Sequence, residues 1–169
     1  MTNLKQTHEK AACERFISLY NKITGSQLKF VRLGNPNRKE PDCICNNNVA
    51  IELVNNFDNP YQAEKLWSEA RGKPNMAKPT FLLKSLSDLQ QVVGNKLSKL
   101  NAGNYDGFSG KLLLVCHLQS PLLTNQEVRS YLESYVPFKT DGHFEKYFDE
   151  IWISWQSENS GEWQIGKLE

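Results

Sequence analysis

Glu40-Pro41-Asp42-Cys43-Ile44-Cys45-Asn46-Asn47-Asn48-Val49-Ala50-Ile51-Glu52-Leu53-Val54 is the stretch of sequence that decides the fold. Cys, Ile and Val favour extended backbone on both sides of the asparagines. Asparagine tolerates positive φ, so Asn46 to Asn48 are suited to a tight turn between two strands. The stretch therefore predicts a β-hairpin.

Two acidic residues of this hairpin lie on strands that otherwise carry apolar side chains. Side chains alternate between the faces of a strand, so Asp42 and Ile44 share one face of the first strand, and Glu52 and Val54 share one face of the second. If both acids point to the same side of the sheet, two carboxylates meet over an apolar surface. Such a pair is costly without a proton or a cation to balance it, and a divalent metal ion would do so.

The chain before the hairpin predicts a helix and a strand. Residues 7–25 have the apolar spacing of a helix with one buried face, with Thr7 as N-cap and Gly25 as its stop. Glu9 lies on the side of the apolar stripe and is a candidate for chemistry, although a first-turn glutamate also simply favours the helix dipole. Residues 27–33 alternate polar and apolar side chains and predict a strand.

A second clear helix, residues 86–100, carries lysines near its buried face. Its apolar spacing, at about 100° per residue, places Lys96 inside the buried stripe and Lys99 at the edge of that stripe. A lysine there either extends its ammonium to solvent or reaches the carboxylate pair from above the sheet. Both readings stay open from periodicity alone.

The remaining segments complete an alternation of helices and strands. They are a turn at 34–37, a short helix at 61–70 followed by a Gly72/Pro74/Pro79 loop, a buried strand at 111–118, a helix at 124–135, a helical turn at 144–148, a strand at 150–155 and an edge strand at 162–165. This order predicts a single domain, residues 1–169, of the α/β class: an α/β sandwich around a central mixed sheet flanked by helices.

Composition narrows the classes of protein. The 169 residues are 39% hydrophobic and 23% charged, as in ordinary globular domains. A membrane span needs an apolar run of about 18 residues, and no run in this sequence approaches that length. No secretory signal is present, so we expect a cytoplasmic protein that does not enter membranes and whose four cysteines are free thiols. No second Cys or His pair stands at ligand spacing, which argues against structural zinc.

Basic residues are found on both sides of the hairpin, although the net charge of the chain is only +1. Arg38 and Lys39 precede the hairpin, and Arg71 and Lys73 follow it among aromatic residues. This pattern is compatible with contacts to nucleic-acid phosphates. A solvated loop with scattered basic residues explains the pattern equally well.

The residues described so far resemble the PD-(D/E)XK nuclease superfamily. Pro41-Asp42 followed by Glu52 on the next strand is similar to its signature, and the order of elements is similar to its restriction-endonuclease-like core. The superfamily's lysine would stand two residues after Glu52, where this chain has Val54. The sequence resembles a variant in which that lysine is relocated to the following helix, here at Lys96.

This resemblance implies a metal-dependent nuclease that hydrolyses phosphodiester bonds in nucleic acid, which we expect to be DNA. It implies that Asp42 and Glu52 hold Mg²⁺ or Mn²⁺, with the backbone carbonyl of Leu53 as a third ligand and Glu9 as an extra one. It also implies that Lys96, or else Lys99, orients or deprotonates the attacking water.

Two alternatives remain beside the nuclease. Because Val54 occupies the usual lysine position, the same fold could serve as a non-catalytic module that binds nucleic acid or protein. The chain could also be an unrelated α/β interaction protein that presents Trp152, Trp155 and Trp163 at a partner or homodimer surface.

Overall fold

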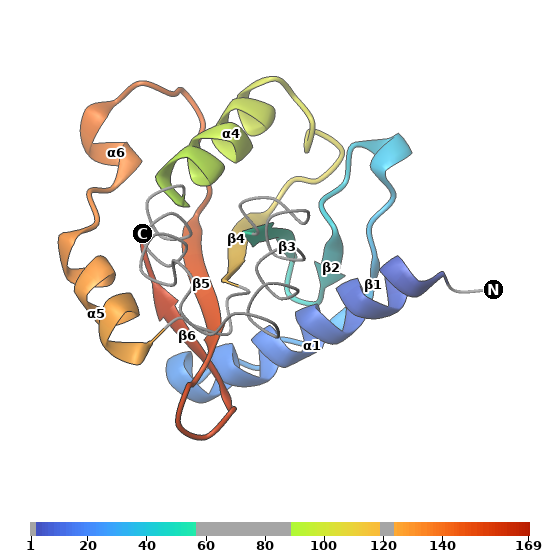
Figure 1. Ribbon diagram of the computed structural model, residues 1–169. Coiled ribbons are helices and arrows are strands. Elements are labelled where there is room, and N and C mark those ends of the chain that lie inside the picture. Colours follow the sequence, from blue (N-terminus) through green and yellow to red (C-terminus); the bar gives the residue numbers. More distant parts are fainter. Residues whose placement is uncertain (1–2, 57–88, 119–123) are drawn as a thin grey trace, which may run out of the picture.

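The computed structural model describes residues 3–56, 89–118 and 124–169 (Figure 1). The helix expected at 61–70, the loop that follows it, and the basic residues Arg71 and Lys73 lie outside the described residues. The described part is of the α/β class, as predicted from the sequence.

Six strands within the described ranges form one open mixed sheet, and they lie side by side in the order of the chain. They are β1 (Phe30–Leu33), β2 (Cys43–Cys45), β3 (Val49–Asn56), β4 (Lys111–Leu118), β5 (Glu150–Gln156) and β6 (Trp163–Lys167). The pairs β3–β4 and β4–β5 are parallel, whereas the pairs toward both edges are antiparallel. The central strand β4 has the bounds expected from its apolar run and is buried except at its first residue.

Helices cover both faces of this sheet (Figure 1). Helix α1 (Leu4–Thr24) packs against one face, where its Phe16 and Ile17 meet Ile51 of β3 and Val115 of β4. Helices α4 (Leu89–Asn101) and α5 (Asn125–Ser134) contribute to a second core on the other face. Alternate residues of the same strands enter the two cores, as the period of a strand requires. The helix predicted at 124–135 is confirmed, with its Thr124–Glu127 capping box.

The start of α1 differs from the prediction. Asn3, not Thr7, caps the helix: its side chain accepts the N–H of Gln6, and the Gln6 side chain accepts the N–H of Asn3. This reciprocal capping box satisfies two otherwise free N–H groups, which explains why the helix begins one turn earlier. Glu9 consequently lies beyond the first turn. Gly25 ends the helix in the left-handed conformation, with φ 71°, as expected.

The turn of the central hairpin follows the sequence closely. Asn47 and Asn48 both have φ 57°, the left-handed conformation that a two-residue hairpin loop of this kind requires. A short 3-10 helix, η1 (Pro36–Arg38), replaces the simple turn expected before the hairpin.

The helical turn expected at 144–148 is wrong, and a short helix α6 (Phe138–Asp141) stands before it instead. The backbone of Lys146 is held by the side chain of Asn101, which donates to its carbonyl and accepts its N–H. Those bonds tie the segment to the end of α4. Phe144 and Phe148 pack into the core beside α4, so the aromatic spacing reflects packing rather than a helix.

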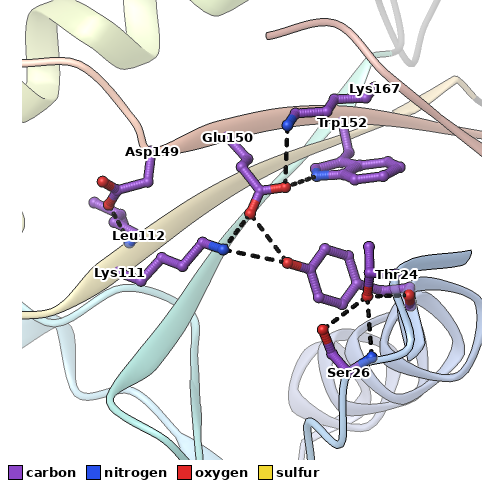
Figure 2. A network of polar contacts seen from close by, with 9 residues as sticks. Thr24, Ser26, Lys111, Leu112, Asp149, Glu150, Trp152 and Lys167 are labelled. Carbon is purple, nitrogen blue, oxygen red and sulfur yellow. Dashed lines mark hydrogen bonds and ion pairs between the residues drawn. The ribbon is translucent and has the colours of Figure 1, made fainter.

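A buried carboxylate ties α1 to the sheet at the start of β5 (Figure 2). Glu150 accepts hydrogen bonds from the hydroxyl of Tyr20 at 3.0 Å and the indole N–H of Trp152 at 3.2 Å. It also forms ion pairs with Lys111 and, at 3.6 Å, with Lys167. One carboxylate therefore joins α1, β4, β5 and β6, with its burial offset by several charged or polar partners.

The tryptophans expected at a partner surface lie largely in the interior. Trp152 and Trp155 are each only 4% exposed, so they belong to the two cores. Trp163 is half-buried beneath the guanidinium of Arg15. All four cysteines are buried free thiols, which confirms that expectation. Within the described ranges, no helix has both the length and the apolar character needed to cross a membrane.

Candidate active site

The hairpin places Asp42 beside Glu52. Cys43 pairs with Ile51 across β2 and β3, and the same register extended by one residue sets Asp42 opposite Glu52. Each carboxylate is anchored on the other's strand: the N–H of Asp42 donates to Oε2 of Glu52 at 3.1 Å, and the N–H of Leu53 donates to Oδ2 of Asp42 at 2.9 Å. The two acids predicted from the hairpin are therefore brought together.

Two further side chains reach the same glutamate from the α4 side. The Nζ of Lys96 lies 2.7 Å from Oε1 of Glu52, and the hydroxyl of Tyr105 donates to that oxygen at 3.0 Å. The Lys96 and Glu52 side chains are only 14% and 8% exposed. Lys96 thus turns inward to the carboxylate pair instead of extending its ammonium to solvent.

The electrostatics of the pair are unbalanced. Burial, the charge of Glu52 and the charge of Glu9 raise the pKa of Asp42 to about 7, against the opposing effects of the Leu53 N–H and Lys96. Two facing carboxylates with one ammonium leave an excess negative charge in a partly desolvated site. Near neutral pH, Asp42 is therefore partly protonated.

Close backbone contacts hold the segment that carries Asp42. A Cβ on Gly34 would lie 1.6 Å from the carbonyl oxygen of Pro41, and a Cβ on Gly107 would lie 1.7 Å from that of Arg38. The N–H of Gly107 donates to the carbonyl of Lys39 at 2.9 Å. Gly34 thus lets the chain after β1 pack against the residue before Asp42, and Gly107 lets the loop after α4 pack against the backbone of Arg38 and Lys39.

The oxygen atoms available at this site are of the type that a hard divalent cation prefers as ligands. Carboxylate and carbonyl oxygens are the ligands that Mg²⁺ prefers, and Mg²⁺ usually keeps several waters beside one or two carboxylates. Along an extended strand the N–H and C=O of one residue project to the same side, so the Leu53 carbonyl shares the side on which its N–H meets Asp42. Asp42, Glu52 and that carbonyl could therefore serve as ligands.

Glu9 is near this pair without joining it as a third carboxylate. Its charge contributes to the raised pKa of Asp42, and its own side chain is paired with Lys5 at 3.6 Å. Among the described residues, no three His, Cys, Asp or Glu side chains are grouped closely enough to hold a metal ion. The role of Glu9 as an extra ligand stays a prediction.

The two candidate lysines of α4 occupy different places. Lys96 reaches Glu52, whereas Lys99 is exposed near the end of the helix. Val54, at the position where the resembled signature has lysine, packs against the core on the α4 side of the sheet. The ammonium that contacts Glu52 comes instead from Lys96, 44 residues later in the chain.

Of the four predicted nucleic-acid contacts, the structure describes Arg38 and Lys39. Both are exposed, at the end of η1 and only a few residues before Asp42. Lys39 has φ 56°, the left-handed conformation that turns the chain toward Pro41. The two basic side chains thus lie next to the acids in the chain, on an exposed turn.

Tyr105 is the site residue that sequence reasoning missed. It is a buried aromatic residue, 6% exposed, within a loop rich in glycine and polar residues between α4 and β4. An aromatic residue in such a loop signals that the loop folds back onto the protein, but it does not tell which partner the hydroxyl of a tyrosine finds.

Comparisons of the chain with protein-family models, with curated proteins and with solved structures find no match. The resemblance to the PD-(D/E)XK nucleases therefore rests on the residues of this chain and on the arrangement just described.

Proposed function

We propose that this protein is a metal-dependent nuclease that hydrolyses phosphodiester bonds, with DNA as its expected substrate. The observation that carries the proposal is the 2.7 Å contact between Lys96 and Glu52, next to the paired Asp42. An acid from each hairpin strand and a lysine from the following helix converge at one place. Two carboxylates can hold a divalent ion that polarises a phosphoryl oxygen, and an ammonium beside them can stabilise negative charge that develops during hydrolysis.

Asp42 and Glu52 would hold Mg²⁺ or Mn²⁺ together with the carbonyl of Leu53. When bound, the ion polarises the scissile phosphate and lowers the pKa of a bound water. The raised pKa of Asp42 supports this role, because a group that resists ionisation for lack of positive charge gains most from a cation.

Lys96 would act on the attacking water and on the charge that develops at phosphorus. An ammonium fixed by a carboxylate costs little reorganisation when negative charge grows beside it. Arg38 and Lys39 would contact the phosphate backbone near the scissile bond without reading sequence. Lys99 remains a weaker candidate because it is exposed away from Glu52.

A single variant tests the proposal. Asp42→Asn keeps an acceptor for the Leu53 N–H but removes the charge, so it should abolish Mg²⁺- or Mn²⁺-dependent cleavage of plasmid and single-stranded DNA. Calorimetric titration with MnCl₂ should show weaker binding in the same variant. Asp149→Asn is the matched control, because the Asp149 carboxylate also accepts a strand N–H, from Leu112 of β4 at 2.7 Å.

The outcomes separate the nuclease from the binding module. Cleavage by Asp42→Asn at the wild-type rate would overturn the proposal. Failure of the wild-type protein to cleave DNA or bind either metal would favour a non-catalytic module on the same fold. In that case DNA affinity should fall in Arg38→Gln/Lys39→Gln while staying unchanged in Asp42→Asn.

A further inference from the structure

The oxygens of Glu52 face different partners. Oε1 accepts from both Lys96 and Tyr105, at 2.7 Å and 3.0 Å, whereas Oε2 accepts the backbone N–H of Asp42 at 3.1 Å. With both donors on one oxygen, the carboxylate cannot rotate without breaking a hydrogen bond. Its orientation relative to Asp42 is therefore fixed from three directions.

The hydroxyl of Tyr105 is itself held in place by its loop. Consecutive turns shape residues 102–108, and the N–H of Gly107 fastens this loop to the carbonyl of Lys39. The ring of Tyr105 packs against Phe148, with centroids 6.1 Å apart. A rigid aromatic ring carries its hydroxyl to a set position, so this donor reaches Glu52 at little cost in side-chain entropy.

Packing alone does not explain a tyrosine at this position. Phenylalanine would fill the same space against Phe148, and a buried hydroxyl is retained only where it is hydrogen-bonded. Its partner is the one buried acid that also binds Lys96. The hydroxyl thus serves the carboxylate rather than the core.

We propose that Tyr105 is a positioning residue of the candidate site, which orients Glu52 toward Asp42 and keeps Lys96 on the shared oxygen. This inference rests on the proposed function where it concerns metal and cleavage. The orientation of Glu52 does not depend on that function and is testable without metal. Partners that orient metal ligands typically change metal affinity by about 10–100-fold when they are removed.

The test is Tyr105→Phe, with Tyr135→Phe as the matched control. Tyr135, at the end of α5, also donates to a carboxylate, that of Glu169 at 2.9 Å. Two readouts are measured: the side-chain carboxyl ¹³C resonance of Glu52 in metal-free protein, and the Kd for Mn²⁺ by calorimetry. Tyr105→Phe should shift the resonance and raise the Kd about tenfold, with cleavage recovering in part at high Mn²⁺. Tyr135→Phe should change neither.

Each outcome bears on a different step. An unshifted Glu52 resonance in folded Tyr105→Phe would overturn the positioning role outright. A shifted resonance with an unchanged Kd would overturn its role toward the metal. If the wild-type protein binds no Mn²⁺ and cleaves nothing, the proposed function fails, while the metal-free resonance still decides whether Tyr105 orients Glu52.

Discussion

The ammonium of Lys96 and the carboxylate of Glu52 form an ion pair at 2.7 Å, although 44 residues separate them in the chain. The pair joins α4 to the middle of β3 in a nearly buried setting. Removing one member of a buried ion pair leaves the other charge uncompensated, which costs more than the pair contributes as a whole. Lys96 is therefore tied both to stability and to the proposed chemistry.

Lys96→Met should lower stability and cleavage together. It keeps the aliphatic stem but leaves Glu52 and Asp42 facing each other without an ammonium, so we expect a loss of about 2–4 kcal/mol at pH 8. The loss should shrink at pH 5, where Asp42 is protonated. Urea unfolding at both pH values measures it. Lys99→Met is the comparison, since that exposed lysine should change the unfolding free energy by less than about 0.5 kcal/mol.

Asp42→Asn should stabilise the protein at high pH while removing activity. The pKa of Asp42 is about 7 in the folded protein against an ordinary value of 3.8. Between these values the folded state holds a proton that the unfolded state lacks, so wild-type stability falls as pH rises. Asn cannot ionise, so its advantage should be near zero at pH 4 and reach on the order of 2–4 kcal/mol at pH 8. If the unfolding free energies of the wild type and of Asp42→Asn changed with pH in the same way, the raised pKa of Asp42 would be contradicted.

Local sequence patterns predicted much of the fold. Consecutive asparagines predicted the hairpin turn because few residues adopt positive φ, and a run of apolar residues predicted β4 because a strand buried on both faces has no polar side. The start of α1 went wrong because two cap signals compete: Thr7 stands nearer the apolar stripe, but Asn3 has the reciprocal partner Gln6. The 144–148 segment went wrong because its aromatic spacing serves tertiary packing.

The candidate site was predictable in part for a related reason. Strand alternation allowed Asp42 and Glu52 to share one side of the sheet, and helical periodicity placed Lys96 within the buried stripe, because both depend on local geometry. The contact between Lys96 and Glu52 itself came only from the structure. Tyr105 was not predictable, since its partner is fixed by the backbone contact between Gly107 and Lys39, which no spacing in the chain encodes. Nor does periodicity tell that Glu150 pairs with Lys111 and Lys167.

One glycine within the lysine helix and one in the loop after it should respond oppositely to alanine. Among the described residues outside its own helix, a Cβ on Gly94, within α4, would meet the ring of Phe138 at 3.5 Å, an ordinary contact. Gly94→Ala should therefore stabilise the protein by about 0.5–1 kcal/mol through helix propensity. Thermal unfolding measures this, and cleavage should be unchanged.

Gly107→Ala should instead displace the loop that carries Tyr105. Its Cβ would lie 1.7 Å from the carbonyl oxygen of Arg38, so one of the two backbone segments must move. We expect a lower unfolding temperature and weaker Mn²⁺ binding in the same variant. The displaced loop would lose both the hydrogen bond of Gly107 to Lys39 and that of Tyr105 to Glu52. Wild-type values for both quantities would show that the loop and the acids are independent.

His117 should make the protein sensitive to acid. It is 1% exposed on β4, and neither of its ring nitrogens has a hydrogen-bond partner among the described residues. Burial, and secondarily the charge of Arg15, lower its pKa to about 4 from an ordinary 6.5. The folded state thus resists a proton that the unfolded state accepts, so stability is lost as pH falls from about 6.5 toward 4, by up to about 3 kcal/mol.

His117→Phe should reduce this loss of stability at acid pH, because phenylalanine cannot be protonated. It can also keep the edge contact with Trp163. At pH 7 it should also be as stable as the wild type or more so, since it removes a buried polar ring that makes no hydrogen bond to any described residue. His143→Phe, at an exposed histidine, is the control and should retain the wild-type pH profile. The measurement is the unfolding free energy in urea at half-unit steps from pH 4 to 7. If His117→Phe lost as much unfolding free energy as the wild type between pH 6.5 and 4, the acid sensitivity would come from other groups.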